Sequence, residues 1–151
     1  MYKKEVKYVD FDGSEVTEEL WFHLTKAEIT EMEYSVNGGL VNTIQRLQKE
    51  QDISKIISLI KTIILKSFGE KVMDRAGRER FVKTETAREI FASTEAYSEM
   101  FMSFIQDPDS FNAFLIGVLP IDMQKEVKDQ LSSDGQPALT SGQVAPPKAV
   151  R

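Results

Sequence analysis

A run of isoleucines in the middle of the chain constrains the fold more than any other feature. Between Ile53 and Phe68, apolar residues recur at the i, i+3, i+4 and i+7 spacing of a helix, with lysines on the opposite side. The stripe consists of Ile56, Ile57, Ile60, Ile63 and Ile64. Although β-branched residues also favour strands, this periodicity predicts a helix, and its wide apolar face predicts the central core element. Asp52 is predicted to cap the helix and Gly69 to close it in the left-handed conformation.

The first 24 residues predict a β-hairpin. The segment from Lys3 to Phe11 is rich in strand formers, and Asp12-Gly13 supplies the residues of a tight turn. Apolar and polar residues then alternate from Val16 to Leu24. Because an isolated hairpin is marginally stable, we expect its apolar face to rest on helices.

Capping residues predict the other helices. Thr25 and Glu28 have the form of a capping box, which predicts a helix to about Tyr34. Asn37-Gly38-Gly39 ends it, and a second helix is predicted from Leu40 to about Lys49. Further helix starts are predicted at Thr84, at Ser93 or Thr94, at Asp107-Pro108 and at Pro120. Before Thr84, the segment that contains Gly69 and Gly77 is predicted to have one tight turn, at Arg75-Ala76-Gly77.

These elements predict a mostly helical α+β fold in one domain. The chain has 151 residues, a length that fits a single core. We expect residues 1–131 to form that domain, with the hairpin of residues 1–24 packed on a helical bundle in residues 25–131. About five to seven helices are expected in the bundle. From Ser132 onwards the chain holds three of its five prolines and no aromatic residue, which predicts a disordered tail over residues 132–151.

The composition argues against several classes of protein. A net charge of −5 and an isoelectric point near 5.0 argue against a nucleic-acid binder and against attachment to anionic lipid. The longest apolar pattern is interrupted by lysines and is shorter than the ~20 residues of a membrane span. The charged N-terminus does not resemble a signal peptide. We therefore expect a soluble cytosolic protein that contacts neither nucleic acid nor a membrane.

No recognisable catalytic motif is present. The chain has no cysteine and a single histidine, so thiolate chemistry is excluded and a metal site would need carboxylates almost alone. Gly69 and Gly77 are eight residues apart and neither precedes the Lys-Ser/Thr pair of a phosphate loop. We expect no enzymatic activity, no cofactor and no metal.

Two groups of residues are candidates for partner contacts. Residues 61–90 carry eight Lys or Arg against five Asp or Glu, between acidic ends, and the interleaved carboxylates favour a solvated face or an acidic partner over nucleic acid. The basic candidates are Lys71, Arg75, Arg78 and Arg80. Thirteen large apolar residues occur between positions 91 and 119, as a helical core, a partner groove or both. The apolar candidates are the exposed members of Tyr97, Met100, Phe101, Phe104, Phe111 and Phe114.

The order of several short motifs resembles a known family. The motifs are Phe68-Gly-Glu-Lys71, Gly77-Arg78, Arg80-Phe81-Val-Lys83 with Phe91, Thr94-Glu-Ala-Tyr97-Ser-Glu, Phe101-Met, Ala113-Phe114 and Gly117-Val-Leu-Pro120. Over about residues 50–120 the chain resembles the tail assembly chaperones of long-tailed, siphovirus-type bacteriophages. It departs from the family pattern at Val72-Met73, where small and acidic residues are usual, and at Phe68, where a tyrosine is usual.

The resemblance implies a function without catalysis. It implies a helper that binds the tape measure protein, keeps it soluble and promotes assembly of tail tube protein around it. It also implies action in the host bacterial cytoplasm, absence from the mature virion and a longer partner form made by ribosomal frameshifting. The chain is also a possible homo-oligomer. The alternative that the sequence leaves open is a structural virion component, such as a tail completion or connector protein.

Overall fold

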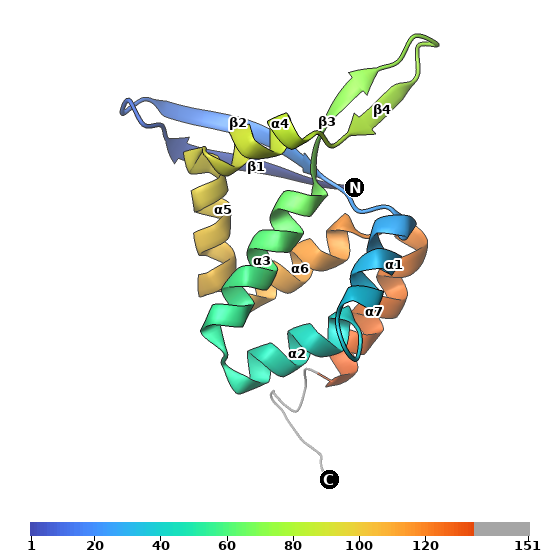
Figure 1. Ribbon diagram of the computed structural model, residues 1–151. Coiled ribbons are helices and arrows are strands. Elements are labelled where there is room, and N and C mark those ends of the chain that lie inside the picture. The colour runs from blue at the N-terminus through green and yellow to red at the C-terminus, as the bar shows by residue number, and fades with distance from the viewer. Residues whose placement is uncertain (135–151) are drawn as a thin grey trace.

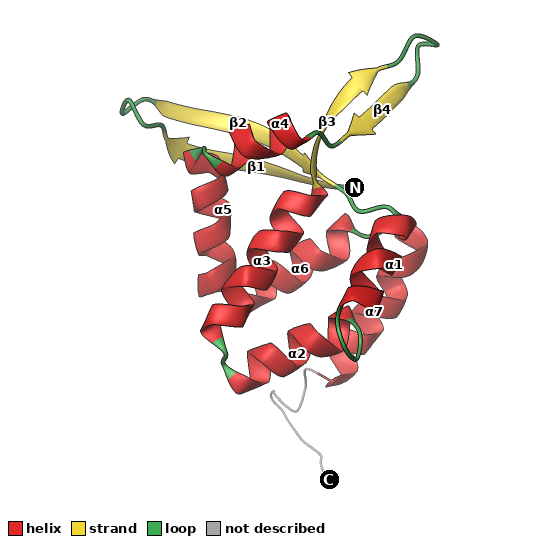
Figure 2. Cartoon of the chain, viewed as in Figure 1, coloured by secondary structure: helices red, strands yellow, loops and turns green. Residues whose placement is uncertain are grey.

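Two β-hairpins lie at one end of the molecule, with one helix at their level and the other helices below them (Figures 1 and 2). The computed structural model describes residues 1–134, and the bounds that follow refer to this part of the chain. The strands are β1 (Tyr2–Val9), β2 (Glu15–Phe22), β3 (Phe68–Met73) and β4 (Glu79–Val82). The helices are α1 (Lys26–Ser35), α2 (Leu40–Glu50), α3 (Ile53–Ser67), α4 (Glu85–Ala92), α5 (Glu95–Gln106), α6 (Pro108–Val118) and α7 (Ile121–Asp134). The prediction of a mostly helical α+β fold is confirmed.

The N-terminal hairpin forms as predicted. β1 and β2 pair antiparallel from Tyr2 opposite Phe22 to Val9 opposite Glu15. Gly13 provides the positive φ of +87° that the turn requires. The hairpin buries Val6, Leu20 and Phe22 against the helices, so its apolar face lies where the alternating pattern places it.

A second hairpin corrects the prediction that residues 25–131 form a helical bundle without strands. Within this range β3 and β4 pair antiparallel from Glu70 opposite Val82 to Met73 opposite Glu79. We call residues 68–82 the β3–β4 arm. Its turn is the one expected at Arg75-Ala76-Gly77, with Gly77 at φ +80°. The four strands form one sheet in the order β1-β2-β3-β4.

The role predicted for Gly69 is wrong. α3 ends at Ser67, and Phe68 continues in extended conformation at φ −67° and ψ 139° because it pairs directly with Phe22 of β2. Gly69 lies within β3 and has no positive φ. It is needed for another reason: an added Cβ would lie 2.7 Å from Cε2 of Phe81 on the neighbouring strand.

The predicted helix caps are present. Thr25 and Glu28 form a complete capping box at the start of α1. The Asp52 carboxylate accepts a hydrogen bond from the Lys55 amide at the start of α3, at 3.4 Å. Thr84, Thr94 and Asp107 cap α4, α5 and α6 in the same way. Each of these caps depends on residues close together in the chain.

The core joins the first hairpin to the helices. Ile60, Ile63 and Ile64 of α3 are fully buried, as the isoleucine stripe predicts. Phe22 of β2 is the aromatic centre of the core, with ring centroids 5.8 Å from Phe68, 5.8 Å from Phe91 and 5.3 Å from Phe114. Burial of these large rings is the main source of stability.

The prediction places the start of the disordered C-terminal tail too early in the chain. α7 continues through Asp134, so residues 132–134 are helical. The reason is that Met123, Val127 and Leu131 pack against the core at i, i+4 and i+8 and hold the helix to its last turn. The rest of the expected disordered tail, residues 135–151, lies outside the described residues.

Candidate partner-binding surfaces

The structure divides the six apolar candidates into two groups. Met100, Phe104, Phe111 and Phe114 are buried in the core, so they are not among the exposed members on which the prediction of partner contacts depends. They are covered because α5 and α6 pack on each other, on α3 and on β1. Tyr97 and Phe101 are half-buried, with ring centroids 5.8 Å apart. Of the six, only these two keep substantial surface for a partner.

All four basic candidates lie on the β3–β4 arm. The Lys71 ammonium lies 3.6 Å from the ring centroid of Trp21, a cation–π contact. Arg80 Nε pairs with the Asp74 carboxylate at 2.8 Å. Arg75 in the turn and Arg78 directly after it are exposed and form no ion pair with any side chain described in residues 1–131. The arm therefore carries two guanidinium groups that are available to another molecule.

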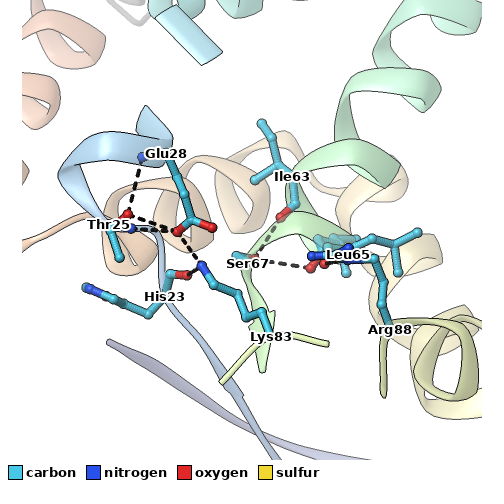
Figure 3. A network of polar contacts seen from close by, with 9 residues as sticks. His23, Thr25, Glu28, Ile63, Leu65, Ser67, Lys83 and Arg88 are labelled. Carbon is cyan, nitrogen blue, oxygen red and sulfur yellow. Dashed lines mark hydrogen bonds and ion pairs between the residues drawn. The ribbon is translucent and has the colours of Figure 1, made fainter. Parts of the chain in front are cut away.

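A polar network fastens the base of the arm to α1 (Figure 3). Lys83 Nζ donates a hydrogen bond of 2.8 Å to the carbonyl oxygen of His23 and forms an ion pair with Glu28. The Lys83 side chain is only 11% exposed, so solvent screens this ion pair weakly. Burial raises the pKa of Glu28, but hydrogen bonds from Lys83 and Thr25 outweigh it and the net pKa is lowered. The strand that leaves the arm is thus held close to the start of α1.

A second set of bonds, also drawn in Figure 3, fixes the turn from α3 into the arm. Ser67 is fully buried and donates its hydroxyl to the carbonyl oxygen of Ile63 at 2.7 Å. Arg88 of α4 donates from Nε to the carbonyl oxygen of Leu65 at 2.9 Å. These bonds satisfy carbonyl groups at the end of α3 and tie α4 to it.

An apolar groove opens between α3 and the junction of α5 and α6. We call it the isoleucine groove, and its volume is about 410 Å³. It is lined by Gln48, Gln51, Ile53, Ile56, Ile57, Ile60, Phe104, Ile105, Pro108 and Phe111. None of these residues is charged, and Ile53 is 58% exposed. The sequence predicted the isoleucine stripe as core only, although its breadth exceeds what one packed face can cover.

A second groove, between α4 and the sheet, is acidic. Two depressions of about 240 and 530 Å³ share Glu18, Ile90 and Thr94, and we call them together the acidic groove. Its carboxylates are Asp10, Glu18, Glu70 and Glu89, and its lining holds no Lys or Arg. None of the four carboxylates pairs with a cation among residues 1–134. Sequence analysis missed this groove because its residues come from distant segments.

The hydroxyl of Tyr8 interacts with carboxylates of the acidic groove. Its hydroxyl donates a hydrogen bond of 2.7 Å to the Glu18 carboxylate. This bond is the largest cause that raises the pKa of Tyr8 to about 12, with further contributions from burial and from the charges of Glu18 and Asp10.

The described residues hold no candidate metal site and no candidate membrane span. No three histidine or carboxylate side chains in residues 1–134 gather where they could hold a metal ion. No helix in this range is both long and apolar enough to cross a membrane. Residues 1–134 do present surfaces of the kind that protein partners contact: the isoleucine groove, a depression of about 320 Å³ lined by residues of α1, α2, α6 and α7, the acidic groove and the β3–β4 arm.

Comparison with known protein families identifies the family of the chain. A family model described as phage tail assembly chaperone matches residues 1–149. Because the match spans nearly the whole chain, the chain belongs to the phage tail assembly chaperone family, and the resemblance seen in the sequence is confirmed. Comparisons with curated proteins and with solved structures gave no significant match. Family membership implies interaction with tail proteins.

Proposed function

We propose that this chaperone binds the tape measure protein, keeps it soluble and promotes assembly of the tail tube around it, without catalysis. The observation that carries the proposal is the isoleucine groove, whose lining residues are uncharged and mostly apolar. A long helical protein with exposed apolar stripes aggregates unless those stripes are covered. Apolar side chains at positions i, i+3, i+4 and i+7 of such a helix match a groove between helices.

The position of the groove supports reversible binding. Ile53 is the first residue of α3 and Ile105 lies one residue before the end of α5, so both rims are helix ends. A partner helix seated there covers Ile53 and the half-buried Ile56 and Ile57 without displacing the fully buried Ile60. Binding therefore requires no rearrangement of the core, and release leaves the chaperone folded.

Co-expression with the tape measure protein tests the proposal. We expect the wild-type chaperone to hold the tape measure protein in the soluble fraction and to co-purify with it. The test variant combines Ile53→Glu with Ile105→Lys, which places charge on both rims of the groove. A negative charge at the start of α3 and a positive charge at the end of α5 both interact favourably with the helix dipoles. We expect this variant to lose most of the soluble tape measure protein.

A matched control separates lost binding from lost folding. Ile121→Glu also changes an exposed isoleucine at the first position of a helix, but Ile121 does not line the isoleucine groove. It should leave solubilisation unchanged, and circular dichroism should show the same helicity for all three proteins. If the groove variant is folded and still solubilises the tape measure protein, the groove is not the binding site.

The remaining parts of the proposal concern the assembly sequence. We place the chaperone in the host bacterial cytoplasm during assembly, in contact with tail tube subunits and with a longer frameshifted form of itself, and outside the finished virion. Quantitative mass spectrometry of infected cells and purified virions checks this. A stoichiometric amount in the virion would instead support the alternative of a tail completion or connector protein.

A further inference from the structure

We propose that the free edge of β2 binds an extended segment of another protein, which carries lysine or arginine and adds to the sheet as an antiparallel strand beside the acidic groove. In strand addition, main-chain hydrogen bonds supply affinity and alternate side chains supply specificity. The contact does not use the isoleucine groove, so the proposal goes beyond the chaperone function proposed above and does not depend on it.

Most of β2 is paired on one side only. Every residue of β2 pairs with β1, whereas only Trp21 and Phe22 pair with β3. Beyond this point the two strands diverge, and the tips of the two hairpins point away from each other (Figure 1). No strand of the described chain pairs with the β3 side of residues 15–20, and Thr17, Glu18 and Glu19 are exposed. This stretch of β2 is therefore a strand edge open to solvent.

The pairing at the end of β2 shows which backbone groups the free edge offers. The His23 amide, one residue beyond β2, donates to the carbonyl oxygen of Ser67 on the β3 side at 2.8 Å. Backbone groups of an extended chain point alternately to its two sides, so the amides and carbonyls of Thr17 and Glu19 face the β3 side too. Their side chains point away from the core, because the neighbouring Leu20 is buried in it. A partner strand bonds to Thr17 and Glu19.

The acidic groove lies where β2 and β3 diverge. Its smaller depression is lined, together with residues of α4, by Glu18 and Leu20 of β2 and by Phe68 and Glu70 of β3. The carboxylates of the groove form no ion pair with any side chain described in residues 1–131. An added strand places every second side chain beside them, so lysine or arginine there meets opposite charge. The exposed Ile90 offers apolar surface to the aliphatic stem of a lysine.

The opposite face of the added strand lies on the side of Trp21. This half-buried side chain stands at the end of the free edge, where Trp21 pairs with Gly69. The residues between the basic ones point to this face of the sheet, and an apolar side chain there packs toward the indole ring. The segment that fits the edge therefore alternates basic and apolar residues.

Charge and hydrogen bonding favour this occupant over others. The carboxylates of the acidic groove repel phosphate groups and acidic segments, and so does the overall charge of −5. A helix bonds its own backbone groups internally and leaves those of β2 without partners. A basic extended segment satisfies both the charges and the strand edge.

Titration of the full chain with a synthetic peptide tests the proposal. The peptide alternates lysine and valine over about eight residues, within the usual length of a strand, and both its ends are blocked. Trp21 is the only tryptophan, so its fluorescence follows binding at the end of the edge. We expect binding that weakens as salt rises and that slows hydrogen exchange of the Thr17 and Glu19 amides. A peptide that alternates glutamate and valine should not bind.

Methylation of peptide amides tests strand addition itself. Opposite residues of an antiparallel pair share one face of the sheet, so the valines lie opposite Thr17 and Glu19 and supply the bonded amides. Methylation of the valine amides should weaken binding at least about tenfold, since it removes several hydrogen bonds. Methylation of the lysine amides, which face away from β2, is the matched control and should change the affinity less than about twofold.

A proline in β2 tests the edge from the side of the protein. Thr17→Pro removes an amide that faces the free edge, and it should weaken binding at least about tenfold. Lys7→Pro is the matched control, because Lys7 is the partner of Thr17 in the β1–β2 register and its amide faces away from β2. It should not weaken binding. Circular dichroism checks that both variants fold, and the methylated peptides test the same bonds without any change to the protein.

Neutral groove residues test the contribution of charge. Glu18→Gln with Glu70→Gln should weaken binding of the lysine peptide at least about fivefold. Glu31→Gln with Glu99→Gln is the matched control, because both positions are exposed and lie outside the acidic groove. It should leave the affinity nearly unchanged.

Four results would overturn the proposal. They are no binding of the lysine peptide at low salt, equal binding of the peptide with methylated valine amides, equal binding by folded Thr17→Pro, and equal binding by the variant with neutral groove residues. A fall in peptide affinity as the concentration of the chain rises would show that a second copy occupies the edge, which also overturns the proposal.

Discussion

At the scale of single residues, a few side chains fix the geometry where strands meet helices. Lys83 joins the end of β4 to α1, and Ser67 and Arg88 satisfy carbonyl groups at the end of α3. Gly69 allows β3 to pass close to Phe81. These contacts decide how the β3–β4 arm leaves the body of the molecule.

Replacing Gly69 with alanine should destabilise the protein by about 1–3 kcal/mol. The new Cβ would lie 2.7 Å from Phe81 Cε2 and 2.8 Å from Lys83 Cγ, and Lys83 cannot move freely because its ammonium is held. Urea denaturation measures the loss. In a Phe81→Ala background the same change should cost less, since one obstacle is gone. An equal cost in both backgrounds would show that Phe81 is not the obstacle.

His23 should make stability depend on pH. Its Nδ1 is buried without a hydrogen-bond partner among the described residues. Burial is the main cause that lowers its pKa, the charges of the amino terminus and Lys83 add to this, and Glu28 opposes it. The unfolded chain therefore binds a proton at higher pH than the folded chain does. The stability that the neutral imidazole of His23 contributes is complete above a pH of about 6.5 and is lost as the pH falls below that value.

Two measurements check the behaviour of His23. Because His23 is the only histidine, proton NMR of its imidazole gives its pKa without ambiguity. The urea concentration at the unfolding midpoint of the wild type should be lower at about pH 5.5 than at about pH 7.5. His23→Gln should reduce this difference. A measured pKa at or above the ordinary histidine value would contradict the prediction.

At the scale of elements, the sequence predicted local features well and long-range pairing poorly. The caps at Thr25, Asp52 and Thr94 follow from a few adjacent residues and are confirmed. The β3–β4 arm was missed because β3 follows α3 without a loop, and its pairing with β2 joins residues far apart in the chain. A glycine after an apolar helix usually marks a helix end, and here tertiary pairing overrides that local signal.

The candidate surfaces show the same limit. The four basic candidates lie together because they are neighbours in sequence and share one hairpin. The apolar candidates could not be sorted, since periodicity gives the apolar face of a helix but not which part a neighbouring helix covers. Four of them lie in the core, because neighbouring elements cover them in the folded chain.

The turn of the arm should depend on Asp74. Its Oδ1 accepts hydrogen bonds of 2.9 Å from the amides of Ala76 and Arg78, and its Oδ2 pairs with Arg80. Asp74→Ala should therefore accelerate amide hydrogen exchange in β3 and β4 several-fold while leaving the urea midpoint nearly unchanged, because the arm lies outside the core.

The other hairpin provides the control for this prediction. Asp12 accepts a hydrogen bond of 3.0 Å from the Ser14 amide, so Asp12→Ala should loosen the β1–β2 turn and leave the arm protected. Unchanged exchange in the arm of the Asp74 variant would show that β3–β4 pairing alone maintains the turn.

At the scale of the whole molecule, one core unites the hairpin with the helices. Every fully buried apolar residue of the described chain lies between Val6 and Leu119, and half-buried contacts continue to Leu131 of α7. Among the described side chains, the core and the residues packed on it extend from the first hairpin to α7.

A chain that ends at Asp134 should be as stable as the full chain. Truncation removes none of the core residues found in the described part of the chain, so the urea midpoint and the dependence of unfolding free energy on urea should both stay the same. Parallel denaturation of the two chains measures this. A lower midpoint together with a shallower urea dependence in the truncated chain would show that residues 135–151 also pack on the domain.

The environment of Phe22 has a consequence for synthesis of the chain on the ribosome. The ring of Phe22 packs on Phe91 and Phe114, and the next core residue, Leu24, donates its amide to the carbonyl oxygen of Val118 at 2.8 Å. At bacterial translation speed, the residues between Phe22 and Val118 take roughly 5 to 20 s to make. For all of that time the set of residues that covers the apolar face of the first hairpin is incomplete. A chaperone of tail assembly thus spends its own first seconds with part of a hydrophobic surface uncovered.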